Sequence, residues 1–124
     1  MIDSGAISFD SIHMIEFEDK TCFGCGEENQ RGLQLKLKFD PDTQTAFGEY
    51  RAGQDLEGAA NIIHAGIVSA LLDETMTTVN KYLEFFALTG EITVRFLQPA
   101  FINENLYIRG WHVKKNKRVI ENRA

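Results

Sequence analysis

Apolar side chains between residues 62 and 83 recur with the period of an α-helix that has one broad buried face. These positions are Ile67, Val68, Leu71, Leu72, Met76, Val79, Tyr82 and Leu83. Steps of three and four residues bring such side chains onto one side of a helix. The sequence therefore predicts a long helix that begins near Ala65, directly after His64, and we expect the rest of the chain to form the sheet on which it packs.

Most segments outside this helix alternate between apolar and polar residues, as strands do when one face is buried. The predicted strands are residues 33–39, 45–51, 92–99, 106–113 and a short one from 119 to 124. Turn residues at 40–43 should join the first two strands into an antiparallel hairpin. Residues 52–61 should form a loop, Thr89-Gly90 a break before the third strand, and residues 114–118 a basic turn.

One long helix and five strands predict an α+β domain over residues 1–124, an antiparallel sheet wrapped around one long central helix. Residues 1–21 show no clear period, and we expect this N-terminal extension to drape over the domain. The apolar residues that would do so are Phe9, Ile12, Ile15 and Phe17. Because a wrapped sheet leaves edge strands and part of the helix uncovered, the arrangement favours a dimer that continues the sheet.

Charge and composition narrow the classes of function. A net charge of −5 argues against a nucleic-acid partner, because there is no excess of Lys and Arg to neutralise phosphates. No apolar run approaches the roughly 20 residues that span a bilayer, and acidic residues in segment 1–21 are unlike a secretory signal. With two cysteines, the default compartment is a reducing cytoplasm, without a membrane partner.

Cys22 and Cys25 form a single C-x-x-C pair among glycines. A structural zinc site usually has four ligands, and the three histidines of the chain lie at no finger-like spacing from this pair. A thioredoxin-type redox pair would lie between a strand and a helix. The pattern therefore favours a buried structural loop, with metal binding and redox chemistry as alternatives, and we predict no metal and no organic cofactor.

Two acids, Asp73 and Glu74, lie in the middle of the predicted helix. At about 100° per residue, Asp73 shares its face with small side chains, where a carboxylate is costly unless it has a partner or a role. Glu74 lies one residue further round the helix, so we expect it to be solvated or to contact another subunit. The N–H groups at the start of the helix form a second candidate site, because they can bind an anion or a developing oxyanion.

Several short motifs occur together in a particular order. They are Cys22-Phe23-Gly24-Cys25-Gly26, Asn29, Gly32-Leu33, His64-Ala65-Gly66, Leu72-Asp73-Glu74 and Thr93-Val94-Arg95-Phe96-Leu97-Gln98-Pro99. From about residue 22 to residue 119 the chain resembles the hotdog-fold acyl-CoA thioesterases, most closely the phenylacetate-pathway (PaaI-like) branch. The resemblance implies hydrolysis of acyl-CoA or aryl-CoA thioesters in homodimers or dimer-of-dimers homotetramers, with active sites at the dimer interface and no cofactor.

The resemblance also implies roles for single residues. The family has an acid nine positions after the motif His, which here is Asp73 after His64. Asp73 would act as general base or as nucleophile, facing the helix N-terminus of the other subunit. The Ala65 N–H would polarise the thioester carbonyl, while His64 either donates to that carbonyl or holds its loop. Thr89 would support the water or the acid, with a strand cap as the alternative.

A further set of residues is expected to bind the substrate. These are Gly66, Glu74, Thr77, Arg95, Lys115 and Arg118. The cations among them, together with Lys114 and Lys117, would contact the phosphates of coenzyme A; the alternative is a solvated hairpin tip. We expect three aromatic residues to pack within the sheet or in an interface, with the lining of an acyl pocket as the less favoured alternative: Phe85, Phe86 and Trp111.

Three features depart from the family pattern. Ala65 replaces the usual Gly and adds a methyl group close to the thioester, and Gly58 stands where some relatives have Asn. Family members continue beyond the position of Ala124 into a completed fifth strand and usually one more, so the sheet is expected to be short. These departures favour an alternative, a hotdog domain that binds acyl-CoA without cleaving it, and the presence of Asp73 opposes it. A hydratase-type hotdog is disfavoured because the His precedes the acid.

Overall fold

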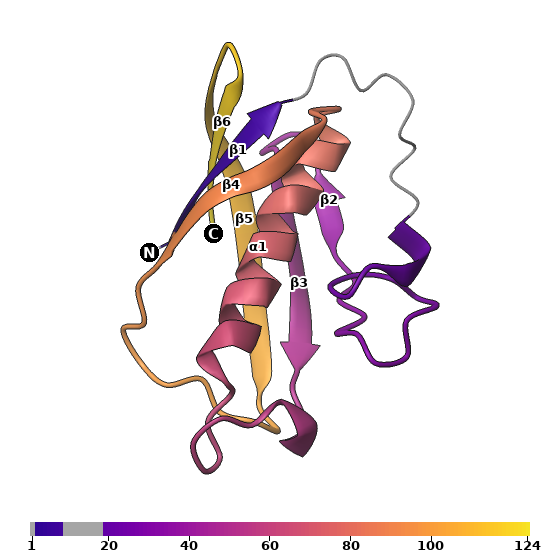
Figure 1. Ribbon diagram of the computed structural model, residues 1–124, viewed down its shortest axis with the longest axis vertical. Helices are drawn as coiled ribbons and strands as arrows, with labels where there is room; N and C mark the ends of the chain where they lie inside the picture. The colour runs from indigo at the N-terminus through magenta and orange to yellow at the C-terminus, as the bar shows by residue number, and fades with distance from the viewer. Residues whose placement is uncertain (1, 9–18) are drawn as a thin grey trace.

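One long helix, α1 (Ala65–Tyr82), lies across one face of a curved six-stranded antiparallel sheet, as Figure 1 shows. The computed structural model describes residues 2–8 and 19–124. The sheet has the strand order β2-β3-β5-β6-β1-β4, so β2 and β4 are its edges. The helix begins at Ala65 and runs for 18 residues. The predicted fold class, an antiparallel sheet wrapped around one long helix, is confirmed.

The strands vary in length from three to twelve residues. They are β1 (Ile2–Ser8), β2 (Lys38–Asp40), β3 (Thr45–Arg51), β4 (Ala87–Val94), β5 (Asn105–Asn116) and β6 (Val119–Arg123). Two short 3-10 helices, η1 (Asp19–Thr21) and η2 (Gln54–Leu56), lie in the connections. The predicted hairpin is present, because β2 pairs with β3 in antiparallel register.

The core lies between α1 and the concave face of the sheet. Leu71, Met76 and Val79 of the helix are almost fully buried, and Leu71 packs in a cluster with the leucines of segment 33–35 and Ile108 of β5. Burying each such side chain contributes roughly 1.5–3 kcal/mol. The predicted helix face is therefore correct at its centre, whereas Tyr82 at its end is exposed and stacks on Phe39.

Residues 33–37 do not form the predicted strand, and β2 is correspondingly short. Gln34 has φ 52°, outside the extended region. The N–H groups of Leu33 and Leu35 donate to the carbonyls of Phe23 and Gly24, at 2.7 and 2.8 Å. Leu33 and Leu35 are buried as expected, but their backbone pairs with the cysteine loop instead of a neighbouring strand.

The predicted break at Thr89-Gly90 is wrong, because both residues lie inside β4. Thr89 pairs with Ala6 and Glu91 with Gly5, so the register shift leaves Gly90 as the extra residue of a β-bulge. The strand ends at Val94, and residues 95–99 lie outside it. Gly90, which suggested a turn in the sequence, instead occupies a β-bulge within a continuous strand.

The N-terminal segment supplies a strand that the sequence pattern did not predict. Strand β1 pairs antiparallel with both β4 and β6 and so completes the sheet between them. The apolar residues expected to drape over the domain, Phe9, Ile12, Ile15 and Phe17, lie outside the described residues. At the other end of the chain, β5 extends to Asn116, which narrows the predicted basic turn to Lys117 and Arg118.

Candidate functional site

Asp73 and Thr89 come together although one lies on the helix and the other on the edge strand. The Thr89 hydroxyl donates a hydrogen bond to Oδ1 of Asp73 at 2.7 Å. Because β4 packs alongside α1, Thr89 reaches the acid from inside the strand, which excludes the alternative of a strand cap. The bond orients one carboxylate oxygen and, within the described part of the chain, leaves Oδ2 without a hydrogen-bond donor.

A cavity of about 820 Å³ opens beside this pair. Its polar side is Asp73, Thr77 and Asn80 of α1, and its apolar side is the segment 85–88 that leads into β4. Such a volume lies within the range of roughly 300–1,000 Å³ that is usual for ligand pockets. An apolar group could rest on Phe85 and Phe86 while a polar bond faces the carboxylate of Asp73.

A buried chain of hydrogen bonds supports the floor of this cavity. Asn122 of β6 donates from Nδ2 to Oδ1 of Asn80 at 2.7 Å and to the carbonyl of Met76 at 3.1 Å. Its own Oδ1 lies 3.0 Å from Nδ1 of His112 on β5. Asn80 and Asn122 are buried, so these bonds tie α1 to two strands and hold Asn80 against the cavity.

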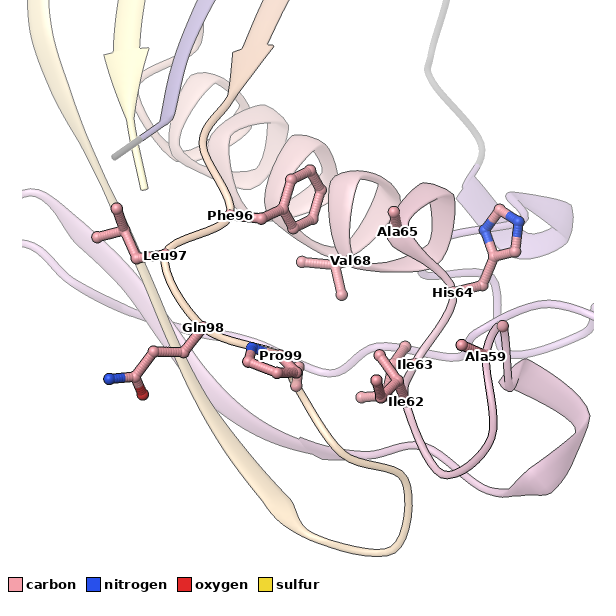
Figure 2. Close-up of a pocket in the computed structure, with 12 residues that line it drawn as sticks. Ala59, Ile62, Ile63, His64, Ala65, Val68, Phe96, Leu97, Gln98 and Pro99 are labelled. Atoms are coloured by element: carbon pink, nitrogen blue, oxygen red, sulfur yellow. The ribbon is translucent and has the colours of Figure 1, made fainter.

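The start of α1 borders a second, apolar cavity of about 410 Å³, drawn in Figure 2. Nδ1 of His64 accepts a hydrogen bond from the Gly66 N–H at 2.9 Å, so this side chain caps the helix. Ala65 lines the cavity at the first helical position, where an N–H has no intrahelical partner. In Figure 2, Phe96 leans over α1 near Val68, while Gln98 points away.

Glu74 does not take the solvated or subunit-contact position that the sequence predicts. Its side chain is buried within its own chain, where Cys22 Sγ lies 3.8 Å from Oε2 and Lys81 Nζ 3.7 Å from Oε1. Lys81 also approaches Cys25 Sγ at 3.6 Å and Asp19 Oδ2 at 2.7 Å. The cysteine loop is therefore held against the helix through the neighbour of Asp73.

This environment changes the pKa of two groups. Burial, and then a hydrogen bond to Glu74, hold the pKa of the Cys25 thiol far above its ordinary value. For Lys81, burial lowers the pKa, but the hydrogen bond to Asp19 and the nearby Cys25, Glu74 and Asp19 outweigh it, so the pKa is raised. Cys25 is thus a protonated thiol at neutral pH, and Lys81 is a firmly charged ammonium.

The raised pKa of Cys25 predicts that stability falls in alkaline solution. The unfolded thiol deprotonates near its ordinary value of 9.0, whereas the folded thiol holds its proton to higher pH. Between these two pKa values the folded state binds more protons than the unfolded state. The contribution of the Cys25 thiol to the free energy of unfolding is therefore complete below the unfolded pKa and is lost as pH rises toward the folded pKa. Urea unfolding under reducing conditions and with a metal chelator present, from about pH 8 to 10, should show this decline. Cys25→Ala should flatten it, and an equally steep decline in that variant would contradict the expectation.

The remaining predicted substrate-binding residues are scattered. Thr77 lines the larger cavity, and Lys115 reaches its margin because Nζ lies 5.1 Å from the ring centre of Phe85. Gly66 serves the helix cap. Arg95 and Arg118 are exposed, and neither is among the residues that line the two cavities described above.

Sequence reasoning missed several residues that the structure places at the site. No sequence motif includes Asn80 or Asn122. Asp19 and Lys81 become recognisable as site residues only when the structure shows the cysteine loop packed on the helix. A weak signal existed for the apolar wall, because residues 85–88 form an apolar run directly after the helix. Its position against Asp73 depends on β4 returning beside α1.

No helix in the described part of the chain is long and apolar enough to cross a membrane.

Comparisons with known proteins bear on the fold. The scan against protein-family models gives no match, and no curated protein matches the sequence. Among solved structures, the chain resembles a crystal structure described as a thioesterase superfamily protein, with a TM-score of 0.70 and 18% sequence identity. The match covers 79% of this chain and 58% of that one, so it spans little more than half of its neighbour's length. At this identity the likeness establishes the fold, and the chain has the hotdog fold.

Proposed function

We propose that this protein is an acyl-CoA thioesterase in which Asp73 is the catalytic acid. The observation that carries the proposal is the 2.7 Å hydrogen bond from Thr89 to Asp73 at the margin of the larger cavity. A threonine hydroxyl that holds one oxygen of a half-buried carboxylate orients the acid, as attack on a thioester requires. The likeness in fold to a thioesterase superfamily protein supports the same class of reaction.

In this proposal, the Asp73 carboxylate either takes a proton from a water molecule that attacks the thioester carbon or attacks that carbon itself. Negative charge then develops on the carbonyl oxygen, and a free N–H at a helix start would stabilise it. The products are a free acid and the thiol of coenzyme A. The apolar side chains of segment 85–88 would receive the acyl group, and Lys115 beside Phe85 would meet the phosphates of coenzyme A.

A second copy of the chain would complete the site. Ala65 and Asp73 lie on the same helix, eight residues or roughly 12 Å apart at 1.5 Å per residue, and they line different cavities. One chain therefore does not place its own helix start against its own acid. Strand β4 is a sheet edge, and large apolar side chains are exposed on and beside it, namely Phe86, Leu88, Phe96 and Leu97. Pairing through this edge would cover them.

The experiment that tests the proposal is thioester hydrolysis over a panel of aryl-, short-chain and long-chain acyl-CoAs, followed by the released thiol. We expect turnover of at least one member, with specific activity that falls on dilution as a homo-oligomer dissociates. A wild-type protein that hydrolyses none of the panel, yet is thermally stabilised by one of its members, would overturn hydrolysis in favour of acyl-CoA binding without cleavage.

A further inference from the structure

The side chains of Cys22, Cys25 and Glu74 converge on the side of α1 next to Asp73. One donor atom from each lies within 4.8 Å of the other two. The carboxylate comes from a residue 52 positions after Cys22 and from a different element, so sequence spacing alone did not reveal this third donor. The structure assigns to this cluster a binding site for one Zn²⁺ ion, with Sγ of Cys22, Sγ of Cys25 and a carboxylate oxygen of Glu74 as ligands.

The donor set and its spacing suit zinc. Zn²⁺ binds thiolates at about 2.3 Å and carboxylate oxygens at about 2.0–2.2 Å in tetrahedral geometry, which puts neighbouring donors roughly 3.5–3.8 Å apart. Cys22 Sγ and Glu74 Oε2 are 3.8 Å apart. Soft thiolates combined with one carboxylate favour Zn²⁺ over the hard cations Mg²⁺ and Ca²⁺.

The loop that carries the two cysteines is built to hold them against the helix. The Gly26 N–H donates to the Cys22 carbonyl at 2.8 Å, and a Cβ on Gly26 would lie only 2.5 Å from the Cys22 nitrogen. A Cβ on Gly24 would lie 2.5 Å from Oε2 of Glu74. The two glycines therefore allow the tight turn and the approach of the carboxylate to both sulfur atoms.

The charges around the cluster match a bound zinc ion. Glu74 Oε1 is buried and, among the described residues, accepts no hydrogen bond. Two thiolates and one carboxylate around Zn²⁺ carry one net negative charge, which the Lys81 ammonium beside Cys25 and Glu74 would neutralise. Three protein ligands leave a fourth position open, and two of these ligands, Cys22 and Glu74, line the larger cavity.

A redox pair explains the same residues less well. Disulfide exchange involves only the two sulfur atoms, whereas in this chain a carboxylate oxygen of Glu74 lies within 4.8 Å of both. A metal ion would use all three donors, taking the place of the thiol protons as it binds the two sulfur atoms and the carboxylate.

Zinc binding to the reduced full-length chain is measured by competition with a chromophoric chelator, and Co²⁺ is used as a spectroscopic probe. We expect one Zn²⁺ per chain, sulfur-to-cobalt charge-transfer absorption, and the visible bands of tetrahedral Co²⁺. Cys22→Ser, Cys25→Ser and Glu74→Gln should each weaken Zn²⁺ binding by more than about 100-fold, since second-shell changes alone cost 10–100-fold. Glu84→Gln is the matched control, because Glu84 is an exposed carboxylate on the same cavity, and it should bind as wild type does.

Failure of a variant to fold would not decide the question, so wild-type protein supplies an independent measurement. Zn²⁺ should raise its melting temperature, because the ion binds the folded state, and the cobalt spectrum reports the sulfur ligands directly. The proposal is overturned if reduced wild-type protein takes up no Zn²⁺, or if Cys22→Ser and Cys25→Ser bind Zn²⁺ as tightly as wild type. It is also overturned if the reduced chain binds no metal and forms a disulfide between these cysteines on oxidation.

Discussion

Asp73→Asn should lower kcat for thioester hydrolysis by about 10²–10⁴-fold, the range typical for a general base. Asparagine has nearly the same shape and can still accept the hydrogen bond that Thr89 donates to Oδ1, so the fold should survive while the charge is lost. Initial rates of thiol release on the best acyl-CoA, with the melting temperature of each protein, measure the effect. If Asp73 makes its interaction only in the transition state, kcat and kcat/KM fall by the same factor.

Two further variants make this result specific. Asp55→Asn is the matched control, because Asp55 is an exposed acid in η2, outside both cavities, and its activity should equal that of wild type. Thr89→Val keeps the side-chain shape but removes the hydroxyl, and we expect a loss of about 10–100-fold, since a hydrogen bond to a charged group contributes about 1.5–3 kcal/mol. Wild-type turnover in Asp73→Asn would show that the catalytic acid is another residue.

Asn122→Ala should lower the free energy of unfolding by about 2–4 kcal/mol, because buried polar groups lose their partners. Asn122 is 2% exposed, and its amide satisfies the Met76 carbonyl, Oδ1 of Asn80 and the ring of His112. The alanine leaves the Met76 carbonyl and Oδ1 of Asn80 buried without that partner, removes the partner of the half-buried His112 ring, and opens a small cavity between α1 and β6. Urea unfolding, followed by circular dichroism, gives the change.

Asn105→Ala provides the comparison for this stability effect. Asn105 is exposed on β5, and we expect a change within about 0.5 kcal/mol. A double-mutant cycle with Asn80→Ala should give a coupling between the two asparagines of about 0.5–3 kcal/mol, as contacting residues do. A loss below about 0.5 kcal/mol for Asn122→Ala would mean that water replaces the amide and that the tie between helix and sheet is not a main source of stability.

The sequence pattern predicted the elements whose signal is local. The apolar period of residues 67–83 located α1 and its start at Ala65, and alternation located β3 over Thr45–Arg51. Both periods are properties of neighbouring residues, so a single sequence contains them. The resemblance to hotdog-fold thioesterases implied that Thr89 supports Asp73 or its water, and the structure places the two side chains within hydrogen-bond distance.

The local pattern gave wrong predictions where the backbone conformation depends on hydrogen bonds to residues distant in sequence. Residues 33–37 alternate like a strand, but Leu33 and Leu35 donate to the cysteine loop. Gly90 belongs to a bulge because β4 is paired with β1, and β1 itself shows no clear alternation.

The sequence by itself determined the class of fold, the position of the long helix and the pair of acids at its centre. Only the tertiary structure decided which acid faces which neighbour. One residue of separation turns a helical side chain by about 100°, so Asp73 meets Thr89 while Glu74 is buried against Cys22 and Lys81. Lys81 belongs to the same helix, but Thr89 comes from β4 and Cys22 from a loop before β2, and only tertiary packing brings these two residues to the acids.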